Sequence, residues 1–341
     1  MQERNISLDI IRTIACLLVL VIHSPIAVTE TNGFLFASMT LLGSPCIGLF
    51  FMVSGYLLLP TNMAMMPFLK KRMSRVLLPT LFWTFIYLLI IYLSGERFQN
   101  QPWTKTFLSI PFTRQGCGFL WFMYALTGLY ILTPIISHWV ANASKREIQF
   151  VLGLWLVTTC YSLLHPFVEL TEDTFGMLYY FTGYAGYFVF GSYIKRFQPK
   201  LSLIMMVGLY LVPFLITFIA KRYEVEFLVD SFGYLCIMTV GQTIAIFLSV
   251  LKVAPPSCSN NTFWIKVLTS FSNCSFGVYL IHKLIMVDII RKMELFGSLN
   301  VYAQILLSII TTAFVAWLFV FTISFIPHSE YIVGFRNKKY I

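Results

Sequence analysis

Charged residues are scarce in this chain of 341 residues, of which 11% are Asp, Glu, Lys or Arg and 58% are apolar. A soluble globular domain carries about 25% charged residues. The shortage therefore indicates an integral membrane protein. We expect an all-α polytopic helix bundle, because lipid offers no hydrogen-bond partner to the edge of an open sheet. Little chain is left for a second unit, so residues 1–341 are expected to form one transmembrane domain.

Several chemical signatures are also missing. The seven cysteines form no CxxC pair, so we expect neither a metal site nor a disulfide. No Gly-rich phosphate loop, HExxH or G-x-S-x-G motif occurs, which removes the usual signs of ATPases, metalloproteases and serine hydrolases. The net charge of +10 is dispersed rather than gathered in a basic arm. We therefore expect membrane lipids, and no nucleic acid, among the partners.

Ten apolar segments are long enough to cross a bilayer as helices. Helix-breaking residues interrupt three of them, at Gly43-Ser-Pro45, Thr133-Pro134 and Pro213, where the helix either kinks or lines a cavity. The ten segments are 8–28, 34–59, 76–95, 118–140, 148–164, 176–194, 201–220, 228–251, 274–292 and 301–325.

The distribution of basic residues predicts the orientation. With the N-terminus inside, the inner segments carry 15 Lys and Arg residues and the outer segments carry 7. This excess predicts that both termini are cytoplasmic. The first segment contains Arg12 and is followed by no A-x-A cleavage site, so we interpret it as an uncleaved span and not as a signal peptide.

Arg12 and His23 lie in this first segment with ten residues between them. Charged and titratable side chains are costly within a membrane, so such a pair is a candidate functional site. Eleven helical steps of about 100° bring the two to nearly the same helix face, roughly 16 Å apart along the axis. We expect both to face one chamber, with Arg12 near one membrane surface and His23 near the midplane.

Each of the two residues also has a structural interpretation. Asp9 lies on the same helix face as Arg12 and can pair with it, or Arg12 can reach lipid phosphate at the membrane surface. A histidine within a span can serve as a polar contact between helices. A histidine within a span is expected to be neutral, which is the form that a general base requires. The helix face that His23 shares with Arg12 favours the functional interpretation.

The densest basic cluster of the chain consists of Lys70, Lys71, Arg72 and Arg75. Arg72 and Arg75 are three residues apart and are expected on one helix face. Guanidinium forks bind phosphate well, which suits a phosphorylated cytoplasmic donor such as coenzyme A. The alternative is plain anchoring by the positive-inside rule.

His282 is the second histidine within a predicted span. Tyr279 shares its helix face, so both can point into the bundle. Ser272 or Asn273 is expected to cap the helix that follows. Trp121 opens the fourth segment, either as an interfacial anchor or as an aromatic face on which a sugar ring stacks.

Five short motifs follow one another along the chain, and in this order they make it resemble the acyltransferase 3 family. Members of that family are ten-span bacterial membrane proteins that transfer acyl groups, mostly acetyl, to cell-surface carbohydrates. The motifs are Arg12-x10-His23, Phe50-Phe-x-x-Ser54-Gly55-Tyr-Leu-Leu, Phe68 with Arg72-x-x-Arg75 and Pro79, Leu120-Trp121-Phe122, and Ser272-x-x-Ser275-Phe-Gly277-x-Tyr279-Leu-x-His282.

The chain departs from many family members in two ways. Phe119 stands where many have a polar residue, often His. Many members also add a C-terminal SGNH esterase-like domain. In length the chain is similar to the stand-alone branch, and we expect the whole activity to reside in the helix bundle.

The resemblance implies a multi-pass O-acyltransferase of the bacterial cytoplasmic (inner) membrane. Its donor substrate would be acyl-CoA, expected to be acetyl-CoA, and its acceptor a hydroxyl of a cell-surface carbohydrate or lipid-linked glycan, with no bound cofactor. His23 and Arg12 are the expected catalytic residues, with His23 acting as general base or carrying an acyl-imidazole. Arg72 and Arg75 are expected to bind the donor. Residues expected to bind the acceptor or relay a proton are Tyr279, His282, Trp121 and Ser54.

A transporter of a glycan or small solute is the main alternative. Arg12, His23, Lys283 and Asp230 would then line a path for the solute or for protons. The chain shows no internal repeat of the kind that such transporters contain, which favours the enzyme. A third interpretation is a non-catalytic assembly subunit, in which replacing Arg12 or His23 would do no more than lower abundance.

Overall fold

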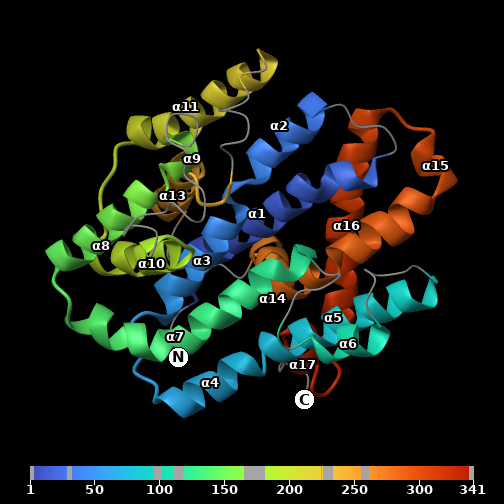
Figure 1. The fold of residues 1–341 in the computed structure, drawn as a ribbon, viewed down its shortest axis with the longest axis horizontal. Helices are drawn as coiled ribbons and strands as arrows, with labels where there is room; N and C mark the ends of the chain where they lie inside the picture. Colours follow the sequence, from blue (N-terminus) through green and yellow to red (C-terminus); the bar gives the residue numbers. More distant parts are fainter. Residues whose placement is uncertain are drawn as a thin grey trace.

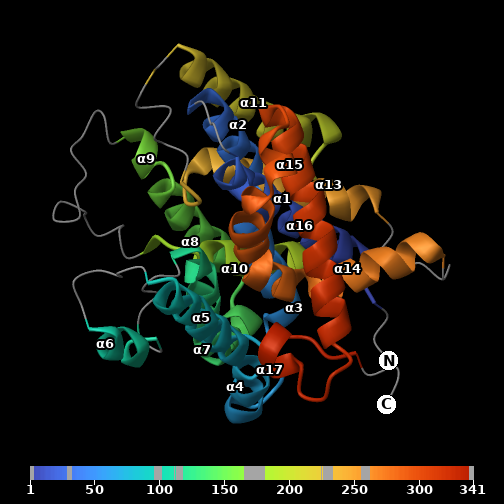
Figure 2. The same cartoon turned by 90° about the vertical axis from the view of Figure 1, so that its right-hand side faces the viewer.

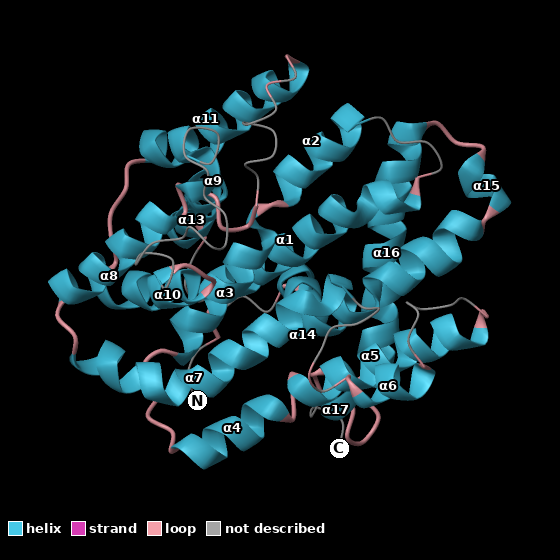
Figure 3. Ribbon diagram, viewed as in Figure 1, coloured by secondary structure: helices cyan, strands magenta, loops and turns pink. Residues whose placement is uncertain are grey.

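The computed structural model describes residues 4–28, 33–95, 102–110, 112, 118–164, 181–223, 225, 233–254 and 262–337. Within these ranges the regular structure is helical and no β-strand occurs (Figure 3). The predicted all-α bundle is confirmed. The first five residues of two predicted segments, 176–180 and 228–232, lie outside the described residues, and so does Asp230.

Seven helical segments in the described ranges are long and apolar enough to cross a membrane, so the protein is a multi-pass membrane protein. Three further predicted segments coincide with shorter helices, namely α8 (Lys145–Thr158), α10 (Ala185–Phe197) and α13 (Ile237–Val253). The number of ten crossings therefore stays a prediction. The seven segments are Ile6–Ala27, Gly33–Leu58, Met65–Leu93, Gly118–Asn142, Leu203–Ala220, Phe263–Lys292 and Val301–Ile323.

Helix α1 (Ile6–His23) runs through the middle of the bundle (Figure 1). Its start is set by Asn5, whose side-chain oxygen accepts a hydrogen bond from the Leu8 backbone N–H at 3.2 Å, because the first turn of a helix leaves its N–H groups unpaired. The helices that pack against α1 are α2 (Gly33–Gly43), α3 (Pro45–Leu58), α13, α14 (Phe263–Lys283) and α16 (Val301–Ile323).

Only one of the three predicted interruptions breaks its helix. Helix α2 ends at Gly43 and α3 begins at Pro45, so that Ser44 alone separates them. By contrast, α7 (Trp121–Asn142) continues through Pro134 and α11 (Leu203–Arg222) continues through Pro213. The Thr133 hydroxyl donates to the Leu129 carbonyl at 2.8 Å, next to the Tyr130 carbonyl that Pro134 leaves without its N–H partner. Proline is tolerated in helices within a membrane bundle.

The closest helix contact in the core joins α3 and α10. A Cβ added at Gly55 would collide with the Phe188 carbonyl, and one added at Gly191 would collide with the Met52 carbonyl. The missing side chains let the two backbones touch, which is how membrane helices gain packing energy without a hydrophobic drive. The remaining helices are α4 (Met65–Met73), α5 (Leu77–Leu93), α6 (Trp103–Leu108), α9 (Tyr161–Leu164), α15 (Glu294–Gly297) and α17 (Glu330–Val333).

Helix α14 differs from the predicted segment 274–292. It begins at Phe263 after Thr262, so Ser272 and Asn273 lie inside the helix and do not cap it, contrary to our prediction. After Lys283 the backbone widens into a π-helical stretch, Leu284–Ile289, and then a 3₁₀ turn, Ile290–Lys292.

Helix α17, close to the end of the described chain, lies in the lower half of both views (Figure 1 and Figure 2). The cytoplasmic location of both termini stays a prediction from the excess of basic residues.

Candidate functional site

His23 and His282 meet where α1 ends against α14. Their ring centroids are 5.0 Å apart with an interplanar angle of 35°. His23 is half-buried, and His282 is completely buried. Because His23 is the last residue of α1, the pair lies toward the end of the span opposite to Asn5. We expected His23 near the midplane.

A hydrogen bond fixes the tautomer of His282. Its Nδ1 lies 2.6 Å from the Tyr279 carbonyl oxygen, and a carbonyl only accepts, so the Nδ1 atom carries the proton and donates. In the neutral ring the lone pair then lies on Nε2. That atom is buried and has no hydrogen-bond partner among the described residues. An unsatisfied buried acceptor costs about 1–3 kcal/mol. A proton or a ligand bound at this nitrogen would remove that cost.

Tyr279 and Phe119 complete the surroundings of the pair. The Tyr279 hydroxyl donates to the Phe119 carbonyl at 2.5 Å, and its ring lies 5.5 Å from that of His282. Phe119 presents its ring edge-on to His282 at 6.0 Å. The Lys283 ammonium lies 4.6 Å from the centroid of the Phe119 ring. Phe119, the departure from the family pattern, therefore holds a cation beside the histidines instead of supplying a polar side chain.

Tyr87 explains the change of helix geometry that follows His282. Its hydroxyl donates to the Leu280 carbonyl at 2.9 Å and accepts from the Leu284 N–H at 3.4 Å. These are the two groups that would pair with each other in a regular α-helix. A side chain inserted in the ladder distorts the helix locally, and π-helical turns occur frequently at functional sites.

A second cluster surrounds Arg12 and Arg72. The Arg72 guanidinium lies 6.0 Å from the centroid of the Tyr130 ring and 5.6 Å from that of Phe68. The Tyr130 hydroxyl is 3.4 Å from the Ser54 hydroxyl. Arg12 lies close enough to both Tyr130 and Arg72 to interact with them electrostatically. Three of the predicted site residues, on α1, α3 and α4, thus gather around a tyrosine of α7.

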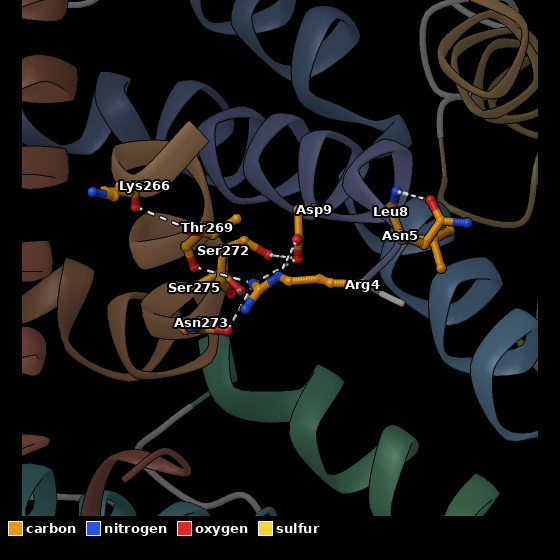
Figure 4. A network of polar contacts seen from close by, with 9 residues as sticks. All are labelled: Arg4, Asn5, Leu8, Asp9, Lys266, Thr269, Ser272, Asn273 and Ser275. Carbon is orange, nitrogen blue, oxygen red and sulfur yellow. Dashed lines mark hydrogen bonds and ion pairs between the residues drawn. The ribbon is translucent and has the colours of Figure 1, made fainter. Parts of the chain in front are cut away.

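The alternative pairing of Arg12 with Asp9 is not what the structure shows. The Asp9 carboxylate forms an ion pair with Arg4 at 2.5 Å and accepts a hydrogen bond from the Ser272 hydroxyl at 2.7 Å. Arg4 also donates to the Asn273 side chain at 2.9 Å (Figure 4). Arg12 forms no ion pair with any residue that the structure describes, although the Asp9 carboxylate lies close enough to attract it electrostatically.

Trp121 lies in neither cluster, and Arg75 lies at the exposed edge of the arginine cluster, close enough to Arg72 to interact with it electrostatically. Helix α4 ends at Met73, so Arg72 and Arg75 do not share a helix face as predicted, and Arg75 is exposed in the turn that follows. Trp121 lies between the rings of Tyr184 and Tyr234, at 5.2 and 5.3 Å. The Trp121 ring therefore belongs to an aromatic cluster at the start of α7.

Sequence reasoning missed Tyr130 and gave Lys283 only a place in a transport path. A signal for Tyr130 is present in the sequence, because Thr127, Tyr130 and Thr133 recur every third residue in an otherwise apolar segment. Such a polar stripe indicates the helix face that points into the bundle. No comparable pattern singles out Lys283 or Tyr87, since their contacts join segments far apart in the chain.

Comparison with known protein families identifies the chain. The family model described as an acyltransferase domain, Acyl_transf_3, matches residues 5–326. The protein therefore belongs to the acyltransferase 3 family and is a membrane acyltransferase. Neither a curated protein nor a solved structure matches the chain significantly.

Proposed function

We propose that the protein transfers an acyl group, expected to be acetyl, from cytoplasmic acyl-CoA to a hydroxyl of a cell-surface carbohydrate or lipid-linked glycan. Membership of the acyltransferase 3 family supports acyl transfer as the reaction. The paired histidines support a hydroxyl acceptor, because an alcohol attacks a thioester readily only when a base removes its proton. This pair, in which Nε2 of His282 has no partner among the residues that the structure describes, is the observation that carries the proposal.

In this mechanism His23 is the general base. It takes the proton of the acceptor hydroxyl as the oxygen attacks the thioester carbonyl. The carbon–sulfur bond then breaks, and the proton passes to the leaving thiolate, so that free thiol and ester are the products. His282, held by Tyr279, receives or orients that proton through Nε2. Transfer through an acyl-imidazole on His23 is the alternative route through the same residue.

Arg12 and Arg72 are proposed to hold the phosphates of the donor. Both are cationic, neither is paired with a carboxylate of the described residues, and Arg72 can present a planar fork to phosphate. The distance along α1 from Arg12 to His23 is about 16 Å. Coenzyme A carries its thioester at the end of a long flexible arm, which can extend along α1 from the arginines to the histidines.

The remaining predicted residues take supporting roles in this proposal. Ser54 lies beside Tyr130 in the arginine cluster and would contact the donor arm, where we had expected a contact with the acceptor. Trp121 offers a ring on which a sugar can stack, beside Tyr184 and Tyr234. Arg75, which is exposed next to Arg72, would attract the anionic donor without holding it. With the N-terminus inside, the arginine cluster is the cytoplasmic half of the site, in keeping with the expected inner-membrane location.

The proposal is tested with sealed membrane vesicles and acetyl-CoA labelled in its acetyl group. We expect label to appear as an alkali-labile ester on glycan when the donor is added to inside-out vesicles, but not when it is added to right-side-out vesicles. His23→Ala should reduce the transfer by about 10²–10⁴-fold. His138→Ala is the matched control, because His138 is an exposed histidine on α7. Normal glycan labelling in the His23→Ala vesicles would refute the mechanism.

A further inference from the structure

A cavity that belongs to neither cluster lies at the cytoplasmic side of the bundle as we orient it. It has a volume of about 480 Å³ and opens between the start of α1, the end of α10 and the neighbouring ends of α11 and α13. Its lining includes Asn5, Gln198, Lys200 and Lys252, and Tyr56 contributes an aromatic wall.

The charge around this cavity is positive and unbalanced. Lys200 and Lys252 are exposed, and neither forms an ion pair with a residue in the described ranges. A third ammonium, that of Lys195, lies 5.9 Å from the centroid of the Tyr56 ring. Lys252 makes one long hydrogen bond, to the Leu201 carbonyl at 3.4 Å. No Asp or Glu occurs among the described residues that line the cavity, and three ammonium groups create a field that attracts an anion.

An apolar groove continues from the cavity. It has a volume of about 370 Å³, runs between α11 and α13, and shares Met206 with the cavity as a lining residue. From Met206 the groove follows α11 through Val207, Tyr210 and Leu211, away from the lysines. Val207 and Leu211 are 47% and 45% exposed, and α11 lies at the edge of the molecule in both views (Figure 1 and Figure 2). The groove therefore faces the lipid.

The cavity is separate from the arginine cluster. Tyr56, which lines the cavity, and Ser54, which contacts Tyr130, are two residues apart on α3. Two helical steps turn the side chain by about 200°, so the two residues lie on opposite faces of α3. A donor bound at Arg12 and Arg72 does not occupy the cavity.

We propose that the cavity and groove together bind one anionic phospholipid of the inner leaflet. The headgroup phosphate would lie among Lys200, Lys252 and Gln198, and one acyl chain would follow Met206 into the groove. A free phosphate or a nucleotide would use the lysines but leave the apolar groove empty, whereas a phospholipid matches both parts. Basic pockets between transmembrane helices at the cytoplasmic side are known to select anionic headgroups.

The test is native mass spectrometry of the purified full-length protein. After detergent exchange, the protein is incubated with mixed micelles of phosphatidylglycerol and phosphatidylcholine in equal amounts, and the bound lipids are counted. We expect the parent to retain phosphatidylglycerol in preference to phosphatidylcholine. One lysine near an anionic headgroup contributes about a fivefold preference, so Lys200→Gln with Lys252→Gln should weaken retention by about 25-fold. The matched control, Arg146→Gln with Lys266→Gln, removes two exposed charges elsewhere and should retain the lipid.

A second pair of variants tests the groove without changing charge. Val207→Trp fills the groove and should weaken retention, whereas Val212→Trp, on the opposite face of α11, should not. Three results would each overturn the proposal: equal retention of both phospholipids by the parent, parent-like retention by both the double lysine variant and Val207→Trp, or displacement of phosphatidylglycerol by saturating acetyl-CoA. Selective retention of a polyprenyl phosphate in place of phosphatidylglycerol would contradict it as well.

Discussion

Helices α1 and α14 contact each other at two polar regions that differ in one respect. At the Asp9 end, the carboxylate is paired with Arg4 and Ser272, and Arg4 in turn reaches Asn273. At the His23 end, the buried Nε2 of His282 has no partner within the described residues. Satisfied polar groups hold two helices together, whereas an unsatisfied one is a cost that a ligand can remove. The first region is therefore interpreted as a structural clamp and the second as a reactive site.

The largest effect on stability is expected at the clamp. Asp9→Ala leaves the Arg4 charge and the Ser272 hydroxyl without their partner. Because the Arg4 side chain is 44% exposed and that of Asp9 only 4%, we expect a cost of about 1.5–3 kcal/mol, that of losing hydrogen bonds to a charged group. We expect reduced abundance and a lower unfolding temperature in detergent, measured by thermal scanning of the purified protein. Asp9→Asn keeps part of the hydrogen bonding and should be milder. Equal stability of Asp9→Ala and the parent would show that the clamp has no structural role.

At the histidine pair we expect a large loss of activity with little loss of stability. His282→Asn keeps a donor near the place of Nδ1, where it can still reach the Tyr279 carbonyl, and removes Nε2. We expect acyl transfer to fall by about 100-fold, the lower end of what acid–base catalysis contributes. The unfolding temperature should fall less than in Asp9→Ala, because the hydrogen bond to Tyr279 can be kept and Nε2 has no partner among the described residues. The rate of label transfer and the thermal scan are measured on one preparation. A large loss of stability with normal transfer per folded molecule would reverse our assignment.

Arg72 in the last turn of α4 and Arg75 in the turn that follows provide a sharper comparison. Arg72→Gln should raise the KM for acyl-CoA by about tenfold, since a hydrogen bond to a charged group contributes about 1.5–3 kcal/mol. Arg75→Gln removes the same charge from an exposed position, and we expect less than a twofold change. Initial rates at varied acyl-CoA concentration test both. Equal effects of the two variants would favour general charge attraction over a binding site.

The smallest effect is expected outside both regions, at the start of α8. Hydrogen bonds from the Ser144 side chain and backbone N–H lower the pKa of Glu147 below its ordinary value. The contribution of this carboxylate to the first turn is thus present above the ordinary pKa of Glu and lost as pH falls through the lowered value. Hydrogen exchange of the α8 N-terminal amides should be faster in Ser144→Ala at neutral pH, with acyl transfer unchanged. Identical exchange in variant and parent would contradict the capping role.

The sequence was sufficient to predict the helix class and most helix positions, for a physical reason. Apolar runs must be helical in lipid, so the segments around α1, α7, α11 and α16 could be located from hydrophobicity alone. Helix ends were harder to place. The start of α14 was expected eleven residues too late, because Ser272 and Asn273 imitate a helix cap although their side chains contact Asp9 and Arg4 instead.

The candidate site was predictable as a set of residues and not as an arrangement. Rare polar residues in apolar segments indicated Arg12, His23 and His282. The sequence could not show that His23 meets His282, that Asp9 binds Arg4 instead of Arg12, or that Tyr87 interrupts α14. Each of these contacts joins elements far apart in the chain, and helical periodicity carries information only about neighbours on one helix.

A double-mutant comparison of His23 and His282 tests the central claim most directly. Acyl transfer is measured in His23→Ala, in His282→Ala and in the variant that carries both changes, at equal amounts of folded protein. If the two histidines act as one catalytic unit, the double variant should be no slower than His23→Ala alone, because residues of one unit are not additive. Losses that multiply would show that the two rings act independently and would contradict our account.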